Sequence, residues 1–280
     1  MLVNYLKINT SRSVLVTDYI ALAGISAALL NAAISGFFYL FLLIATKTVY
    51  TGNLFAALFV TIGFSFFGKN MFNTLPMLFG VFIYEKVKKE KLTNFFIIAM
   101  FSGTIAPIVS EIAFLNGSTS LLKICVAYAV GFFVGFIFPV VAESSKRMHR
   151  GYCLYNGGIA GGFISIFLVG LLRSIGINVL PENYWDTSHT MPLAALLYVL
   201  GTALIVYGII AETPSKAFAK SKQFLGEKDI RDKDYLVEYG NTCYINVGVM
   251  CIVFTSVVLL LKIPINGPTM GGILTVTGFA

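Results

Sequence analysis

The fold is decided by the stretch NAAISGFFYLFLLIATKTVYTGNLFAALFVTIGFS, residues 31–65. It begins inside an apolar run long enough for a helix through a bilayer core, which needs roughly 20 residues. A turn and a second, shorter apolar run follow. Residues 246–280, NVGVMCIVFTSVVLLLKIPINGPTMGGILTVTGFA, show the same plan at an offset of 215 residues. The match predicts an internal repeat that pairs a long apolar helix with a short one.

Identities at uncommon positions support the repeat. Most are not aliphatic, so they stand out from the apolar pairs around them. Upstream, DYIALAG (18–24) aligns with DYLVEYG (234–240) after a one-residue change of offset. The alternative is chance similarity between two apolar helices that precede glycine-containing turns. The five identities are Asn31 with Asn246, Lys47 with Lys262, Gly52 with Gly267, Gly63 with Gly278, and Phe64 with Phe279.

The repeat predicts how the chain is divided. We expect residues 1–216 to form a first transmembrane repeat and residues 217–280 to begin a second. The second copy stops partway, so we expect a fragment or an early-terminated version of a longer protein. Repeated halves with discontinuous helices are common in transporters. An inverted repeat is favoured over a parallel one, and the choice depends on how often residues 47–84 cross the membrane.

The composition predicts a polytopic membrane protein. Of the 280 residues, 57% are hydrophobic and 12% are charged, whereas soluble domains carry about 25% charged residues. Long segments lack Asp, Glu, Lys and Arg altogether, and no soluble core could bury so many of them. We therefore expect an all-α transmembrane bundle with short re-entrant or broken helices. The uncharged segments are 19–46, 92–110, 124–142, 151–172, 187–211 and 239–261.

The basic loops predict an orientation. EKVKKEK (85–91), SKRMHR (145–150) and residues 215–234 hold most of the Lys and Arg that give the net charge of +7. Short basic loops stay in the cytoplasm, and an even number of apolar segments separates each loop from the next. The charge therefore reflects membrane topology, and we expect no nucleic-acid partner. The loop at 174–189 is acidic and falls on the opposite side.

Within residues 47–84, two short apolar pieces (about 52–68 and 71–84) are divided by Gly68-Lys69-Asn70. They are either two thin helices or a re-entrant hairpin and a span. The segment around this break, GFSFFGKN (63–70), differs by one residue from the sequence motif of a phosphate-binding loop. Such a loop requires a preceding strand and a Ser or Thr after the lysine, and here Asn70 follows it. We therefore do not expect a nucleotide site.

The breaks at Gly52-Asn53 and Gly267-Pro268 suggest a solute site instead. A half-helix after each break would direct its N-terminal N–H groups and positive dipole end toward a solute. The alternative is an ordinary loop followed by a tightly packed helix. Asparagines inside spans are suspects for solute contact, although they also join helices. The candidate solute-binding residues are Asn31, Asn53, Asn246, Thr269 and, less directly, Asn156.

Two other features have competing interpretations. In HRGYCLYNGGIAGGF (149–163), the G-x-x-x-G spacings favour close helix packing, and the alternative is an unwound helix start that turns Asn156 toward a cavity. Glu111 is expected to pair with Lys123 at the rim, and the alternative makes it a proton or cation site. No acidic residue lies at the centre of a span, which favours a channel or facilitator of a neutral solute over a proton-coupled pump.

Catalysis has little support in the sequence. The two histidines, His149 and His189, are expected on opposite faces, and no paired carboxylates or nucleophile motif occurs. An enzyme inside the membrane would need at least an acid–base pair. The four cysteines lie in or beside apolar segments, and their spacing forms no metal-binding pair. We therefore expect no enzyme activity, no catalytic or metal-ligating residue, and no cofactor.

The runs HRGYCLYNGGIAGGF, GFSFFGKNMFNTLPMLFGV and NGPTMGGILTVTGFA resemble an uncharacterised bacterial membrane family, domain of unknown function 1576, over most of the chain. The resemblance implies a multi-pass protein of the bacterial inner (plasma) membrane and gives no activity. The layout is also similar to that of urea transporters at the level of architecture. In urea transporters an Asn-Pro motif opens each short helix, whereas here Asn53-Leu54 and Gly267-Pro268 stand at those places.

These observations predict a transporter or channel for a small, neutral or weakly polar solute. The alternative is a membrane scaffold or assembly protein that moves nothing and uses its glycines for packing. A wet central cavity would favour the first, and a dry, fully packed interior would favour the second. The expected partners are the lipid bilayer and the solute, and a homo-oligomer is left open.

Overall fold

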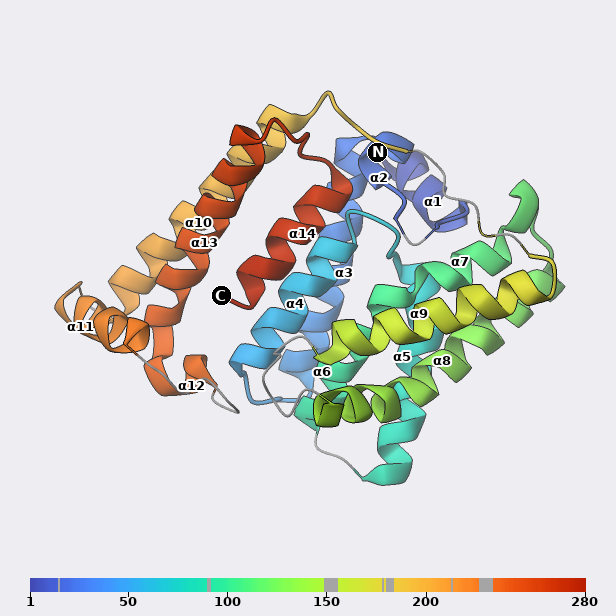
Figure 1. The fold of residues 1–280 in the computed structure, drawn as a ribbon, viewed down its shortest axis with the longest axis horizontal. Helices are drawn as coiled ribbons and strands as arrows, with labels where there is room; N and C mark the ends of the chain where they lie inside the picture. Colours follow the sequence, from blue (N-terminus) through green and yellow to red (C-terminus); the bar gives the residue numbers. More distant parts are fainter. Residues whose placement is uncertain are drawn as a thin grey trace.

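A computed structural model gives the fold and describes residues 1–14, 16–89, 92–148, 156–177, 179, 184–212, 214–226 and 234–280. The backbone of these residues is almost entirely helical (Figure 1). The α-helices are α1 (Leu2–Thr10), α2 (Tyr19–Ala23), α3 (Ile25–Ala45), α4 (Gly52–Phe64), α5 (Met71–Lys88), α6 (Leu92–Ser102), α7 (Pro107–Ala113), α8 (Leu121–Met148), α9 (Asn156–Ser174), α10 (Thr190–Glu212), α11 (Pro214–Leu225), α12 (Tyr235–Tyr239), α13 (Cys243–Leu260) and α14 (Gly267–Gly278). The 3-10 helices are η1 (Gly103–Ile105), η2 (Leu115–Gly117) and η3 (Gly240–Thr242).

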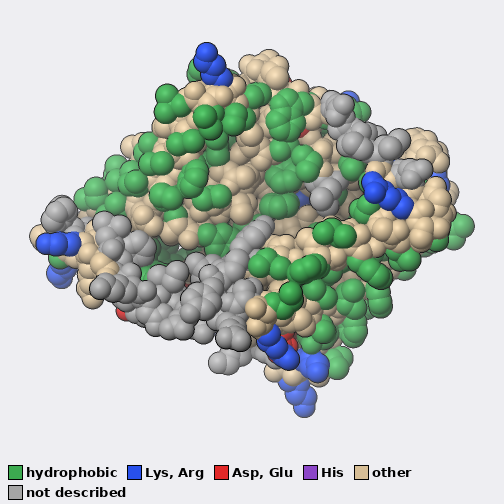
Figure 2. Space-filling view, viewed as in Figure 1, with side chains coloured by type: hydrophobic (Ala, Val, Ile, Leu, Met, Phe, Trp, Pro, Cys, Tyr) green, Lys and Arg blue, Asp and Glu red, His purple; other side chains and the backbone are tan. Residues whose placement is uncertain are grey.

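The long apolar helices confirm the predicted transmembrane bundle. Five are long and apolar enough to cross a membrane in the described residues: α3, α8, α9, α10 and the run Tyr235–Leu260. A sixth span arises if Asn94–Ile105 and Pro107–Gly117, which meet at a 45° bend, count as one. Hydrophobic side chains dominate the face seen in Figure 2, with Lys and Arg toward its periphery. The protein is therefore a polytopic membrane protein.

The segment between α3 and α6 forms two helices, α4 and α5, joined by a tight turn. Helix α4 has 13 residues and is about 20 Å long, too short for a hydrocarbon core of about 30 Å. Helix α5 begins after Asn70, whose side chain accepts from the backbone N–H of Asn73 while Asn73 reciprocates. This capping box fixes the start of α5 and sets the residues between the two helices, 65–70, as a defined turn.

The repeated segments share their local geometry. Gly24 and Gly240, at the ends of α2 and α12, both have positive φ. Lys47 and Lys262, which follow α3 and α13, have φ of 50° and 56°. A non-glycine residue in this left-handed region is uncommon, so the same conformation at two matched lysines is a shared structural feature. The domain boundaries at 216 and 217 stay a prediction.

Helices α4 and α14 pack against each other in opposite directions (Figure 1). Gly63, at the end of α4, lies against the backbone of Gly271, and Gly278, at the end of α14, lies against Ala56. A Cβ at Gly63 would come within 2.9 Å of the Gly271 carbonyl oxygen. Small residues permit such close approach between membrane helices. The antiparallel pair is the arrangement that an inverted repeat produces.

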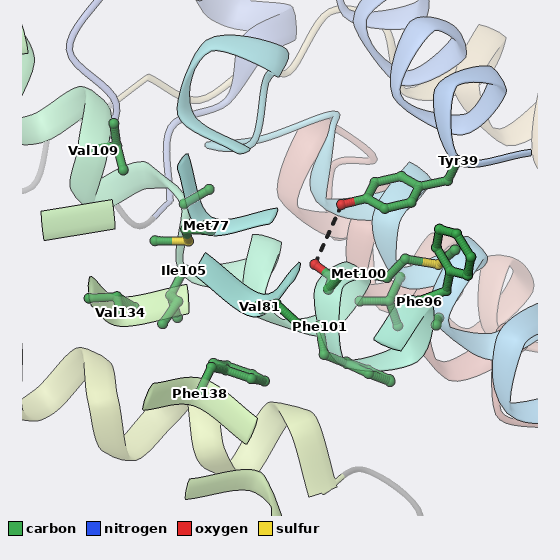
Figure 3. Packing of buried hydrophobic residues seen from close by; sticks show 14 of the residues in the cluster. Tyr39, Met77, Val81, Phe96, Met100, Phe101, Ile105, Val109, Val134 and Phe138 are labelled. Atoms are coloured by element: carbon green, nitrogen blue, oxygen red, sulfur yellow. Dashed lines mark hydrogen bonds between the residues drawn. The ribbon is translucent and has the colours of Figure 1, made fainter. Parts of the chain in front are cut away.

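Two apolar clusters hold the bundle together. One lies around α4, α5, α6 and α8 and includes Tyr39, Met77 and Phe138. The other joins α2, α3, α10 and α14. Figure 3 shows the first cluster, in which the Tyr39 hydroxyl donates to the Ala99 carbonyl at 3.4 Å. Phe101 and Phe138 lie at the edge of this cluster in the same view.

Candidate functional site

A cavity lined by polar, charged and apolar side chains opens beside the N-terminus of α4. Its volume is about 350 Å³. Three carboxamides line it, those of Asn53 on α4, Asn94 on α6 and Asn156 on α9. The structure therefore brings together two residues that the sequence proposed for solute contact, Asn53 and Asn156, although they are far apart in the chain. The other lining residues are Tyr84, Glu85, Ile97, Ile98, Phe101, Phe138, Pro139, Ala142, Glu143, Lys146, Gly157 and Phe279.

Aromatic side chains share the cavity wall with the carboxamides. The ring of Phe101 stacks on that of Phe279, with centroids 6.1 Å apart. The Oδ1 atom of Asn156 is buried, and no hydrogen-bond partner contacts it in the described part of the chain. Buried polar atoms in native structures are normally paired. Within the described residues, Asn156 therefore presents an acceptor oxygen without a hydrogen-bond partner in this wall.

Glycines of α9 place Asn156 at the cavity. A Cβ at Gly157 would lie 2.4 Å from the Phe101 ring, and one at Gly161 would meet Thr104 and Ile105. This face of α9 therefore packs closely against α6 and η1, as the G-x-x-x-G spacing predicted. Gly162, on the second predicted face, has open space around it. Residues 149–155 of the same motif, His149 among them, lie outside the described residues.

The N-termini of the two short helices are occupied by carboxylates, which corrects the expectation that they face a solute. The Gly52 N–H donates to both oxygens of Asp234 at 3.0 Å. The Gly267 N–H donates to Asp18 Oδ1 at 3.1 Å. Each aspartate also caps a helix of its own repeat, α12 or α2. The positive ends of α4 and α14 are thus neutralised by aspartates from the opposite repeat.

These reciprocal caps explain one of the repeated identities, that of Gly52 with Gly267. A Cβ at Gly52 would lie 2.9 Å from Asp234 Oδ1, and a Cβ at Gly267 would lie 2.6 Å from Asp18 Oδ1. Only glycine lets the carboxylate approach so closely. The two ends differ in burial, because Asp18 is fully buried and also accepts from the Asp186 N–H. Burial raises the pKa of Asp18, although its bonds to backbone N–H groups oppose the rise.

Asn31 lies away from the cavity and bonds to the 65–70 turn. Its amide nitrogen donates to the carbonyls of Ser65 and Lys69 at 2.7 and 2.8 Å. The turn's own N–H groups also bond to the chain: Gly68 donates to Thr17, and Lys69 donates to Phe67. A phosphate loop offers free N–H groups to its ligand. The N–H groups of this turn are bonded to carbonyls, in agreement with the sequence interpretation.

The remaining candidates, Asn246 and Thr269, occupy separate places. Asn246 lines a pocket of about 210 Å³ with Tyr239 and Thr242. Thr269 completes the capping box of Asn266 at the start of α14, and its hydroxyl also contacts the Pro264 carbonyl. Neither is among the residues that line the cavity at Asn53 and Asn156. The matched pair Asn31 and Asn246 therefore does not form one site in this structure.

Lys69 is a buried cationic side chain that the sequence interpretation passed over. It is 1% exposed, and its ammonium donates to Thr61 Oγ1 at 3.2 Å. The same nitrogen lies 5.3 Å above the centre of the Tyr39 ring. No carboxylate is within ion-pair distance of it among the described residues. An ionisable residue buried in this way marks a functional site by default.

Glu111 has a different partner from the one predicted. Arg12 donates to both of its oxygens, at 2.8 and 2.6 Å, and the pair is largely buried. Lys123 bonds instead to Leu115 and Ser118. The pairing of Glu111 with Lys123 was therefore wrong, because the chain that follows α1 brings Arg12 against Glu111 of α7. A two-point bond from arginine is strong and geometrically specific, which favours a structural role for Glu111.

Sequence reasoning missed Asn94, Glu85 and Lys69. Asn94 follows a basic loop, so its position near a membrane surface was readable, but its distance to Asn53 was not. Glu85 is 6% exposed in the cavity wall and was counted only as part of a charged loop. Among the described residues, no group of three His, Cys, Asp or Glu side chains could hold a metal ion.

Comparison with known proteins gives a family and no activity. Neither the curated proteins nor the solved structures contain a match to the chain. A family model described as a protein of unknown function (DUF1576) matches residues 1–174 and 213–280. The match covers most of the chain, including both copies of the repeated segment. The protein therefore belongs to the DUF1576 family of proteins of unknown function.

Proposed function

We propose that the protein is a transporter or channel for a small, neutral or weakly polar solute, which enters the cavity at Asn53, Asn94 and Asn156. The observation that carries the proposal is the meeting of three carboxamides around one cavity of about 350 Å³. A carboxamide both donates and accepts hydrogen bonds, so three of them can bind a polar solute that carries no charge. The acceptor oxygen of Asn156, which has no partner among the described residues, supports this interpretation.

The placement of the cavity also supports transport. Its walls come from α4, a helix too short to span, and from α6, part of the span that bends by 45°. Interrupted helices are tolerated at membrane depth where they are buried in protein or line a wet cavity. Solute sites in many transporters lie at such interruptions. The proposal includes no catalytic step, and it places the protein in the bacterial inner membrane, as the family resemblance implies.

Flux through proteoliposomes tests the proposal. Stopped-flow swelling would follow urea, small amides, polyols and monovalent anions in vesicles that contain wild type, Asn156→Leu or Asn246→Leu. We expect wild-type flux of at least one neutral solute and a loss of about 10-fold or more in Asn156→Leu, because a buried amide contact is worth about 1–3 kcal/mol. Asn246→Leu is the matched control, since it removes the same group outside the cavity.

The outcomes separate the alternatives. Unchanged flux in Asn156→Leu would remove this cavity from the path. Loss of flux in Asn246→Leu with normal folding would return that residue to the solute path. If folded wild-type protein moves no solute, the transport proposal fails, and a scaffold or assembly role becomes the better interpretation.

A further inference from the structure

We propose that Lys69 is a proton-binding site that couples solute movement to a pH gradient. The inference rests on the proposed transport function and adds a driving ion to it. During the cycle the Lys69 ammonium would release one proton to water that reaches it from the cavity, leaving a neutral amine. The amine would take up one proton again when it is exposed to the opposite side.

The surroundings of Lys69 suit a group that exists both charged and neutral. A lysine ammonium has three donors, and one of them has an acceptor, Thr61 Oγ1 at 3.2 Å. The face of the Tyr39 ring, 5.3 Å away, also favours a cation. Burial without a carboxylate disfavours the charged form. The site thus supplies modest stabilisation of the ammonium and no fixed counter-charge that would hold it permanently ionised.

A polar stripe on α3 accompanies the lysine. Asn31, Ser35 and Tyr39 follow one another at intervals of four residues, so they share one face of the helix. All three are buried. Asn31 bonds to the Lys69 carbonyl, while Tyr39 lies under the Lys69 ammonium, so Ser35 falls between these contacts. The Oδ1 of Asn31 and the Oγ of Ser35 have no described hydrogen-bond partner. Such atoms are expected to hold water.

No charged group in the described part of the chain contacts Lys69. From α3 it meets Tyr39, from α4 it meets Thr61, and from η1 it meets Gly103. Tyr39 is the titratable group that faces it. Two buried charged residues of the described chain are bonded elsewhere. They are Asp18, which caps α14, and Glu111, which pairs with Arg12.

Lys69 contacts the span that contributes Phe101 to the cavity wall. A Cβ at Gly103 would be 2.6 Å from the lysine nitrogen, so the two are in contact. Phe101, two residues earlier, lines the cavity. The 45° bend of this span follows Gly103–Ile105. Proton coupling at Lys69 requires a movement at this bend that connects the cavity water with the lysine.

The alternative ligand for a buried lysine is an anion, and the geometry favours it less. An anion site gathers several donors, as Arg, Lys and helix N-termini do. Around Lys69 the described groups are a hydroxyl oxygen, an aromatic face and atoms that accept hydrogen bonds. The Asn31 amide hydrogens are already donated to backbone carbonyls. Anion binding is accordingly an outcome for the experiment to exclude.

The test measures proton and solute movement together. Proteoliposomes with an internal pH-sensitive dye and a clamped membrane potential would receive urea, small amides, polyols or monovalent anions with and without a pH gradient. We expect the wild type to move protons with its solute and a pH gradient to drive the solute uphill. Lys69→Met should keep downhill exchange and lose the proton movement. Lys69→Arg should do the same, because a guanidinium retains its proton.

Lys86→Met is the matched control, since Lys86 is exposed on α5 outside the cavity, and it should behave as wild type. Wild-type solute flux without proton movement would overturn the inference and leave the proposed function standing. Proton coupling that persists in both Lys69 variants would overturn it as well. Flux of anions alone, lost in Lys69→Met without any proton movement, would make Lys69 an anion site. A wild type that moves none of the probes would overturn both proposals.

Discussion

Asn31 donates both of its amide hydrogens to carbonyls of the 65–70 turn, at 2.7 and 2.8 Å. The sequence identified it as a suspect because an asparagine inside an apolar helix is uncommon. Sequence alone could not separate a solute contact from a bond between helices, since both require the same side chain. The distinction depends on what lies opposite, and here that is the backbone of a turn 34 positions later.

Replacing Asn31 by leucine should therefore act on stability. The change leaves the Ser65 and Lys69 carbonyls without their donor, and a buried group without a partner costs about 1–3 kcal/mol. We expect a fall of several degrees in the melting temperature of the protein in detergent. Ser35→Ala is the control on the same face, because the Ser35 hydroxyl has no described partner, and it should melt within a degree or two of wild type. Equal melting of all three proteins would contradict the structural role of Asn31.

Lys69 is a second residue whose environment could not be predicted from the sequence. In the sequence it stands in a near-copy of a phosphate loop, between Gly68 and Asn70. Its neighbours argued against a nucleotide and gave no other role. Whether a lysine at a helix break points to water or into the protein is decided by tertiary packing, here by Tyr39 and Gly103. The sequence signal that could have drawn attention to Lys69 is its charge between two short apolar segments.

At the scale of elements, the apolar segments were predictable because each is long and uncharged. The break at Gly68-Lys69-Asn70 was predictable for the opposite reason, since glycine and two polar residues interrupt an apolar run. The partners of the elements were not predictable. Aligning DYIALAG with DYLVEYG matched Asp18 with Asp234, but it could not show that Asp18 caps α14 and Asp234 caps α4. Contacts that cross between repeats leave no trace in either segment alone.

The contact between α4 and α14 makes a prediction about glycine. Gly63→Ala places a Cβ 2.9 Å from the Gly271 carbonyl oxygen, and overpacking of this kind costs about 1–3 kcal/mol. Gly272→Ala, one residue beyond the contact, meets nothing within 4 Å and should leave stability unchanged or slightly raised. Thermal melting in detergent would compare the two. If Gly272→Ala is the more destabilising, the packing of α14 on α4 is not as described.

At the scale of the whole molecule, the two reciprocal aspartate caps differ in burial. The Asp18 cap is fully buried, whereas the Asp234 cap is partly exposed and Gly52, to which it bonds, adjoins the cavity-lining Asn53. The matched sequences of the two copies predict equal burial for the two caps, so this difference could be found only in the structure. Under the proposed function, we expect solute to reach the cavity from the side on which α4 begins. That expectation rests on a cavity whose lining includes Asn53, Asn94 and Asn156.

The most direct test of this account asks whether water fills the cavity in a membrane. Single cysteines would replace Asn156 or Phe167 in a variant without the four native cysteines, and a water-soluble maleimide would be added to proteoliposomes. Phe167 is the control on the same helix, because it is 68% exposed and is not among the residues that line the cavity. In a membrane we expect this side chain to face lipid. A thiol must ionise in water to react, so we predict labelling at position 156 at least 10-fold faster than at 167. Equally slow labelling at both positions would show a dry cavity and contradict the proposed function.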